Sequence, residues 1–402
     1  MKLNKNLLYI LFFTFLVIFS SCSDDDNPIK SKEETIIVSK NLIETLSKNN
    51  IKSLTDLLKV IFPDSDLEIE PKFDVEIYKI EYYSKGKKIT PIVCSGIICV
   101  PKSNEEMRGI TSWQHSSIIS NSEIPSNKGN FNLNYYEPVI TASIGYISTS
   151  YDYLGLGSSQ TEIQPYHIYS YSAEDWLQFL NATNEFISQN SISTNKDLWI
   201  LGYSQGGYNA VSAMKKWETE NHNFFNLKEV YSGAGAYSLT ELFNKIIKQN
   251  EYSLIHLTHL FVRAYNYYYD LNLNYSEIYL PEFQNIDIFF DGSKTSEEIN
   301  EILPEKFDEL FTEKFISEIK NQSGIFYNKL SENNLTKHFI PKHKLYMFHS
   351  NSDDYIPVSI ADSAYETYKN SAGNVELIKS KKSLNHQETY FEFAQFVFNK
   401  LQ

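Results

Sequence analysis

A serine enclosed by glycines is the segment best suited to carry chemistry. Residues 202–207 read Gly-Tyr-Ser-Gln-Gly-Gly, directly after an apolar run at 198–201 and directly before a segment with helical patterning. A serine hydroxyl is a poor nucleophile at neutral pH, so an enzyme must present it where a base can reach its proton. Glycines two positions before and after Ser204 let a strand and a helix approach such a turn without side-chain clash. We therefore interpret Ser204 as a candidate nucleophile, with a tight strand-to-helix turn that has no chemistry as the alternative.

An acid that could act with Ser204 follows an apolar run at 344–349. Asp353 is followed by two residues and then by Ile356-Pro357, in a loop at a strand end where a carboxylate could orient an imidazole. The neighbouring Asp354 is the competing candidate, and the offset from the Ile-Pro pair favours Asp353. Either aspartate could instead cap the helix that begins near Pro357.

The base that completes this set is selected by chain order. Of nine histidines, only His386 lies beyond Asp353, in a polar loop before the last amphipathic segment. The order serine, acid, histidine therefore selects His386, and we interpret His349 as a strand-end residue that supports the acid loop. The alternative for His386 is a histidine at a helix start without a catalytic role.

Attack by Ser204 on a carbonyl also requires donors for the negative charge that develops on its oxygen. We expect the backbone N–H of Gln205 to be one donor, and the loop with His115 and Ser116, after a strand at 110–114, to supply the other. His115 could instead be a buried polar residue held by its neighbours. The chain has no Cys/His spacing suited to structural zinc, and this chemistry needs no metal or organic cofactor.

These residues need a scaffold of strands and helices in alternation. Strand-like runs and helical patterns alternate along residues 36–238 and 338–402, with strands at 76–83, 88–100, 110–114, 146–150, 198–201, 230–234 and 344–349, and helices at 172–189, 205–220 and 389–401. Such alternation predicts an α/β fold, a mostly parallel sheet flanked by helices. Residues 239–337 have helical patterning, at 242–269 and 296–315, and no convincing strand, which predicts a helical cap inserted over the ends of the strands where ligands bind.

The N-terminus is typical of an exported and anchored protein. Lys2 and Lys5 precede an apolar stretch at 7–19, and as a helix these thirteen residues reach about 20 Å, less than a membrane core of about 30 Å. We therefore interpret residues 1–21 as a signal peptide and 22–35 as a polar tether. The small residues before Cys22 resemble a bacterial lipoprotein signal, and the acidic run after it resembles the surface-export signal of Bacteroidetes lipoproteins. This resemblance implies acylation of Cys22 and anchoring to the outer membrane with display at the cell surface; the alternative is loss of Cys22 with an ordinary cleaved signal.

Composition narrows the class of protein. The chain has 402 residues, 42% of them hydrophobic, which excludes a wholly disordered chain and allows one large α/β domain with an insertion. Its 36 Lys+Arg against 50 Asp+Glu give a net charge of −14, which would repel a phosphate backbone, so we expect no nucleic-acid partner. Cys94 and Cys99 lie too far apart on one strand for a disulfide.

Taken together, four segments resemble the α/β-hydrolase superfamily, and within it the secretory lipases and related esterases: Gln114-His115-Ser116-Ser117, Asp152-Tyr153-Leu154-Gly155-Leu156-Gly157, Gly202 to Gly207, and the loop from Asp353 to Pro357 with His386. In these families glycines usually occupy the positions of Ser116 and Ser350, and at Ser116 a Cβ therefore stands where backbone must approach substrate. The resemblance implies a serine hydrolase that cleaves small-molecule or lipid esters through Ser204, His386 and Asp353 by way of an acyl-enzyme.

Two other functions remain open at this point. A serine peptidase on the same fold is the nearer one, and the other is an acidic surface lipoprotein that binds a ligand on an inactive hydrolase scaffold. The aromatic residues of the insertion could line an apolar pocket, stack on sugars or form the core of the helices themselves. The sequence specifies neither the natural substrate nor the oligomeric state.

Overall fold

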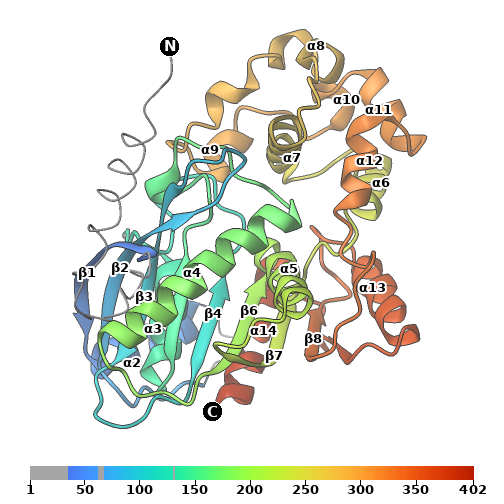
Figure 1. Cartoon of the computed structure of the whole chain (residues 1–402). Coiled ribbons are helices and arrows are strands. Elements are labelled where there is room, and N and C mark those ends of the chain that lie inside the picture. Colours follow the sequence, from blue (N-terminus) through green and yellow to red (C-terminus); the bar gives the residue numbers. More distant parts are fainter. Residues whose placement is uncertain (1–34, 62–67, 130–131) are drawn as a thin grey trace, which may run out of the picture. The chain divides into compact units, whose positions relative to one another are not determined.

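The computed structural model describes residues 35–61, 68–129 and 132–402 (Figure 1). The expected signal peptide, Cys22 and nearly all of the tether lie outside these residues. In the described part of the chain, no helix has the length and apolar character that a membrane crossing requires.

A single sheet organises residues 36–402. Within the described residues it has nine strands in the order β1-β2-β3-β5-β4-β6-β7-β8-β9. From β5 to β9 every neighbouring pair is parallel, whereas β1, β2 and β3 add to the β5 edge in antiparallel fashion. The strands are β1 (Ile37–Leu46), β2 (Val75–Ser84), β3 (Ile92–Pro101), β4 (Ile110–Gln114), β5 (Ile147–Tyr151), β6 (Asp197–Tyr203), β7 (Asn226–Gly233), β8 (Lys344–His349) and β9 (Val375–Lys379).

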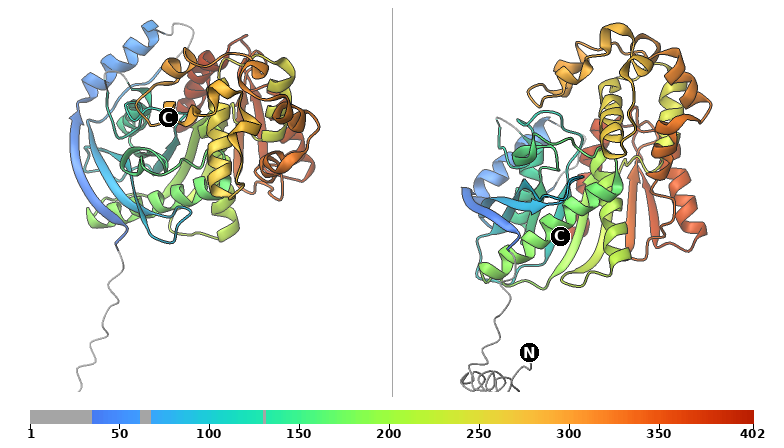
Figure 2. Two further views of the ribbon diagram at one scale, coloured as in Figure 1. Left: turned by 90° about the horizontal axis from the view of Figure 1, so that it is seen from above. Right: turned by 45° about the horizontal axis from the view of Figure 1, so that its top comes forward.

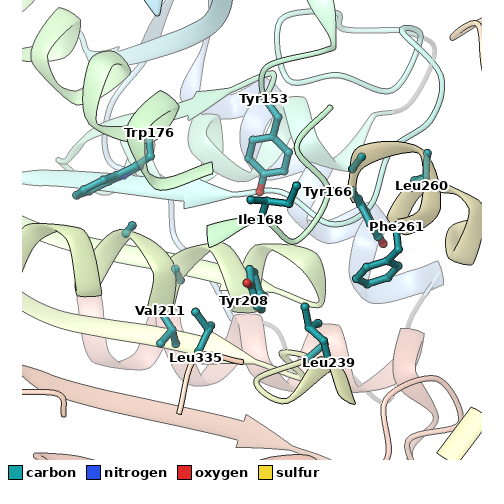
Figure 3. Packing of buried hydrophobic residues seen from close by; sticks show 14 of the residues in the cluster. Tyr153, Tyr166, Ile168, Trp176, Tyr208, Val211, Leu239, Leu260, Phe261 and Leu335 are labelled. Atoms are coloured by element: carbon teal, nitrogen blue, oxygen red, sulfur yellow. The ribbon is translucent and has the colours of Figure 1, made fainter. Parts of the chain in front are cut away.

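Helices cover both faces of this sheet. One buried cluster joins it to α4 (Tyr169–Gln189), α5 (Gln205–Glu220) and α13 (Val358–Asn370). A second cluster joins the other face to α2 (Lys48–Ile61), α3 (Leu133–Ser143) and α14 (His386–Leu401). Figure 3 shows the first cluster, in which Trp176 of α4 and Tyr208 and Val211 of α5 point into the space between these helices and their neighbours. The predicted α/β fold is confirmed.

Between β7 and β8 the described chain forms helices and no strand longer than an isolated bridge. We call residues 239–337 the cap segment; its helices lie beyond the carboxyl ends of the parallel strands (Figures 1 and 2). They are α6 (Leu239–Gln249), α7 (Ile255–Tyr268), α8 (Tyr275–Ile278), α9 (Ser296–Asn300), α10 (Phe307–Leu310), α11 (Glu313–Lys320), α12 (Gly324–Glu332) and the short 3₁₀ turns η3 (Pro281–Phe283) and η4 (Ile286–Phe289). A further 3₁₀ turn, η2 (Gly157–Ser159), follows β5.

Two segments with helical patterning are divided more finely than the sequence indicated. The helix expected over 242–269 is two helices, because Asn250 adopts a left-handed conformation with φ of 62° and ends α6. The helix expected over 296–315 is likewise divided among α9, α10 and α11. The aromatic residues of the insertion pack in or against the buried cluster, in agreement with the alternative that they form the core of the helices, and the following seven do not line the cavity at Ser204: Tyr265, Tyr267, Tyr268, Tyr269, Phe283, Phe289 and Phe290. Cys94 and Cys99 are buried and free, as expected.

Candidate active site

The turn between β6 and α5 presents Ser204 in a conformation that side chains rarely adopt. Its φ is 58° and its ψ is −119°, and such a backbone costs of order 1–3 kcal/mol in a residue other than glycine. The surrounding structure holds it there, because the Ser204 N–H donates to the Gly233 carbonyl at 2.9 Å and the Tyr208 N–H donates to the Ser204 carbonyl at 3.2 Å. This geometry matches the strained strand-to-helix turn expected around a nucleophilic serine.

The flanking glycines are required by close backbone contacts. A Cβ on Gly206 would lie 1.9 Å from the Gln114 carbonyl oxygen, and one on Gly202 would lie 2.2 Å from the Gly206 carbonyl oxygen. Both distances are far below van der Waals contact with backbone that cannot move away. The end of β4 therefore packs directly against the first turn of α5, as the spacing of the glycines predicts.

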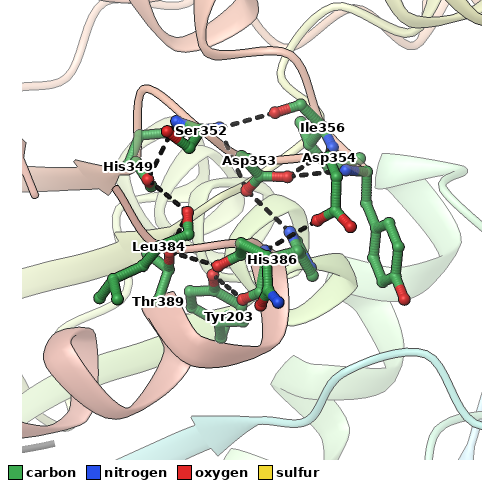
Figure 4. Close-up of polar contacts among 12 residues, drawn as sticks. Tyr203, His349, Ser352, Asp353, Asp354, Ile356, Leu384, His386 and Thr389 are labelled. Carbon is green, nitrogen blue, oxygen red and sulfur yellow. Dashed lines mark hydrogen bonds and ion pairs between the residues drawn. The ribbon is translucent and has the colours of Figure 1, made fainter. Parts of the chain in front are cut away.

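Asp353 and His386 meet although their loops follow different strands (Figure 4). Asp353 Oδ2 accepts a hydrogen bond from His386 Nδ1 at 2.8 Å, and the Asp353 side chain is fully buried. Its other oxygen, Oδ1, accepts from the backbone N–H groups of Tyr355 at 3.0 Å and Ile356 at 2.8 Å. Burial alone would raise the pKa of Asp353, but the hydrogen bond from His386 and its charge when protonated outweigh burial and lower that pKa below its usual value.

The competing aspartate has a different contact. Asp354 Oδ1 accepts from the backbone N–H of His386 at 2.9 Å, so it fixes the start of α14 without bonding the imidazole. The carboxylate hydrogen-bonded to the ring is therefore that of Asp353.

Two residues next to Asp353 hold its loop. His349 Nε2 donates to the Ile356 carbonyl at 2.8 Å and lies 3.4 Å from Asp353 Oδ2, and burial lowers the pKa of His349 and thus favours its neutral form. The Ser350 hydroxyl donates to the Leu384 carbonyl at 2.6 Å, two residues before His386, and accepts from the Ser352 N–H at 3.1 Å. Ser350 thus ties the acid loop to the histidine loop, a contact that the sequence did not indicate.

Ser204 and His386 lie at the same end of the sheet. The hydroxyl of Tyr203, the residue before Ser204, donates to the His386 carbonyl at 2.7 Å, and the rings of Tyr203 and His386 are 5.1 Å apart. Tyr355, whose ring is 5.0 Å from that of His386, lines one cavity together with Ser204. Ser204 and His386 are not hydrogen-bonded to each other here; such contacts often tighten only when substrate binds.

The expected oxyanion donors border the same turn. Gln205 is the first residue of α5, so its N–H has no acceptor within the helix and stands at the positive end of the helix dipole. The Ser116 hydroxyl donates to the Tyr203 carbonyl at 3.3 Å, which places Ser116 beside the end of β6. His115 is buried, its ring stacks on Tyr153 at 3.6 Å, and burial lowers its pKa to about 4.

A small cavity separates this turn from the cap segment. Its volume is about 30 Å³. Ser204 and Gln205 form part of its wall, and the cap segment supplies Leu242, Ile246, Tyr252, Leu254, Leu257, Thr258 and Phe261. A larger groove of about 720 Å³ lies between β2, β3 and the end of α4, and it contains none of the candidate site residues. Among the described residues, no group of three or more His, Cys, Asp or Glu side chains could hold a metal ion.

The sheet is mostly parallel, a strained serine follows β6, and an aspartate after β8 pairs with a histidine after β9. This is the architecture of an α/β-hydrolase. Residues 139–394 match the secretory lipase family model, and the chain belongs to that family. Membership identifies the protein as a carboxylic ester hydrolase.

Solved structures share this fold at low sequence identity. A hydrolase from Legionella pneumophila is 21% identical, with a TM-score of 0.82 over 91% of this chain and 98% of that chain. The rice cell wall degrading esterase LipA from Xanthomonas oryzae is 20% identical, with a TM-score of 0.76 over 91% and 95%. Lipase A from Candida antarctica in its closed state is 12% identical, with a TM-score of 0.64 over 87% and 77%. A search of the curated proteins gives no match.

Proposed function

We propose that Ser204, His386 and Asp353 act as the catalytic triad of this ester hydrolase. Ser204 Oγ attacks the ester carbonyl carbon while His386 Nε2 takes the hydroxyl proton, and Asp353 holds the Nδ1–H and stabilises the imidazolium that forms. The tetrahedral intermediate collapses as His386 returns the proton to the leaving alcohol. Water, deprotonated by His386, then attacks the acyl-enzyme and releases the acid and free Ser204.

The observation that carries this proposal is the buried 2.8 Å hydrogen bond between Asp353 Oδ2 and His386 Nδ1. A proton held at Nδ1 leaves Nε2 unprotonated in the neutral ring, which is the tautomer that a general base requires. We assign the oxyanion contacts to the backbone N–H of Gln205 and to the loop at Ser116. The assignment of the Gln205 N–H as a donor is supported by its position at the start of α5, where backbone N–H groups point outward and can bind negative charge.

The cavity under the cap segment supports a short acyl group. The leaving alcohol must lie beside His386 to receive its proton, and the cavity is lined by Ser204 and Gln205 but not by His386. The acyl chain is therefore the part that enters it, and the small volume of about 30 Å³ favours a short chain.

Export and anchoring remain part of the proposal. Membership of the secretory lipase family agrees with secretion, and the sequence before Ile37 predicts a lipid on Cys22 that holds the enzyme at the outer membrane. Metabolic labelling with an alkyne fatty acid tests this, because label should enter the native protein and be lost in Cys22→Ala.

Turnover of 4-nitrophenyl acetate tests the catalytic assignment. Ser204→Ala should lose nearly all activity, whereas Ser212→Ala, which removes a buried hydroxyl of α5 bonded to the Tyr208 carbonyl, should retain it. A folded Ser204→Ala variant with native turnover would end the proposal. Parallel assays with peptide amides separate the enzyme from a peptidase, which would cleave the amides with comparable kcat/KM.

A further inference from the structure

One wall of the acyl cavity carries a histidine that the proposed mechanism does not use. His167 is 3% exposed and lines the cavity together with Ser204. Its Nδ1 atom is buried and has no hydrogen-bond partner among the described residues. A buried polar atom left unpaired is costly and rare, so its presence beside a nucleophile calls for an explanation.

The backbone of His167 is held in position from two sides. Its φ is 51°, in the left-handed region that few residues other than glycine adopt. Its carbonyl oxygen accepts hydrogen bonds from the hydroxyls of Tyr208 in α5 at 3.1 Å and Tyr265 in α7 at 3.0 Å. The core and the cap segment together therefore fix the residue from which this imidazole projects.

The ring is neutral and rigidly packed. It stacks on Phe261 at 4.9 Å, and the ring of Tyr208 lies 4.6 Å away. Burial lowers the pKa of His167 to about 3, so the imidazole carries no charge at the pH of catalysis. A neutral imidazole offers one hydrogen-bond donor and one acceptor.

Three other polar groups around the cavity already have hydrogen-bond partners. The Ser117 and Tyr166 hydroxyls bond each other at 2.7 Å, and Thr258 donates to the Ile255 carbonyl. A second unpaired atom is the buried side-chain oxygen of Gln205, a residue that also lines the cavity. One hydroxyl group in so small a cavity can donate to one of these atoms and accept from the other.

We infer that His167 selects esters whose short acyl group carries a hydroxyl, such as a hydroxyacetyl or 3-hydroxypropanoyl group. This inference rests on the proposed function, since it places the acyl chain in the cavity beside Ser204. The apolar wall from the cap segment receives the carbons of the acyl group, and His167 with Gln205 receives its hydroxyl. A site that hydrogen-bonds a hydroxyl discriminates strongly against the analogue that lacks it, because the polar groups of the site are then left unpaired.

Paired substrates of equal size test the inference. In hydroxyacetyl and propanoyl 4-nitrophenyl esters, and in 3-hydroxypropanoyl and butanoyl esters, a hydroxyl replaces a methyl group. The measured quantity is the ratio of kcat/KM for the hydroxylated ester to that for its partner. Comparing this ratio between variants removes the intrinsic reactivity of each ester.

Three variants separate recognition from folding. His167→Leu removes the nitrogen atoms, and His167→Gly removes the ring from a backbone that glycine adopts without strain. His167→Asn places an amide near the position of Nδ1 in a residue that tolerates the left-handed region. For at least one pair of esters, the ratio should fall about tenfold in the Leu and Gly variants and recover in the Asn variant.

The outcomes distinguish this inference from the proposed function. Ratios within twofold of wild type in both His167→Leu and His167→Gly, for both pairs, would overturn the role of His167 while leaving the triad intact. A wild-type enzyme that hydrolyses none of the four esters would instead contradict the proposed function. Thermal unfolding of each variant checks that the ratios are measured on folded protein.

Discussion

Replacement of Asp353 by asparagine should abolish most of the activity without disturbing the fold. Asparagine has the same shape, and its side-chain oxygen can keep the two backbone hydrogen bonds that Oδ1 accepts from Tyr355 and Ile356. Its NH₂ group would then occupy the position of Oδ2, 2.8 Å from His386 Nδ1. That group can only donate, so His386 Nδ1 must accept and the ring proton moves to Nε2, where it prevents removal of the Ser204 proton.

The size of the loss follows from this change of tautomer. Enzymes with a Ser-His-Asp triad lose about 10⁴-fold in kcat on this substitution, which corresponds to about 5 kcal/mol of activation free energy. Asp353 is fully buried, so water has no access with which to compensate. His349 offers no relief either, because its Nε2–H is already donated to the Ile356 carbonyl.

The assay is kcat with saturating 4-nitrophenyl acetate at pH 8, with Asp354→Asn as the matched control. Asparagine at 354 can still accept the His386 backbone N–H through its oxygen and leaves the ring tautomer unchanged, so kcat should remain within tenfold of wild type. The reasoning is refuted if folded Asp353→Asn keeps more than a tenth of the wild-type kcat, or if Asp354→Asn loses as much.

Two further variants test contacts that support the site. Ser350→Ala leaves the Leu384 carbonyl without its donor and should lower kcat about tenfold with little change in KM. The control Ser352→Ala changes an exposed neighbour and should leave kcat unchanged. Equal effects of the two substitutions in steady-state kinetics would show that the hydrogen bond between the loops is unimportant. Glu137→Gln should change how stability depends on pH, because burial raises the pKa of Glu137 from 4.5 to about 7 against the opposing hydrogen bond from Tyr390. The folded state therefore binds the proton of Glu137 more tightly than the unfolded state does. Between pH 5 and pH 8 the unfolding free energy of the wild type should fall by about 2–3 kcal/mol, a loss that Glu137→Gln should not show. Identical pH dependence of the two proteins in denaturant titrations would contradict this.

The parts predicted best from sequence are those determined by local pattern. The glycines around Ser204 indicate a turn in which backbone segments pack so closely that only glycine fits. Strand β4 was also expected over the residues that it occupies. The offset from the Ile-Pro pair favoured Asp353 and chain order selected His386, and the structure brings Asp353 Oδ2 within 2.8 Å of His386 Nδ1. In each case a short segment of sequence, or its position along the chain, was enough to make the prediction.

Features that depend on distant parts of the chain were missed. The edge strand β1 is largely exposed, and β9 has no fully buried residue. Neither strand has the regular alternation of buried and exposed residues that marks a half-buried strand, so their pairing with the sheet gives no local signal. The role of Ser350 depends on the loop at Leu384, which lies beside it. The position of His167 depends on Tyr208 and Tyr265, whose hydroxyls donate to its carbonyl from two helices. Such contacts arise only once the fold is formed.

The central claim, that Ser204 is activated as a nucleophile, is tested most directly by reaction with a fluorophosphonate. Only an activated serine displaces fluoride from such a probe readily, and mass spectrometry of the digested protein locates the adduct. We predict one phosphonyl group per chain, on Ser204, with labelling slowed strongly in Asp353→Asn and absent in Ser204→Ala. A folded wild-type enzyme that stays unlabelled, or that carries the adduct on another residue, would contradict the account.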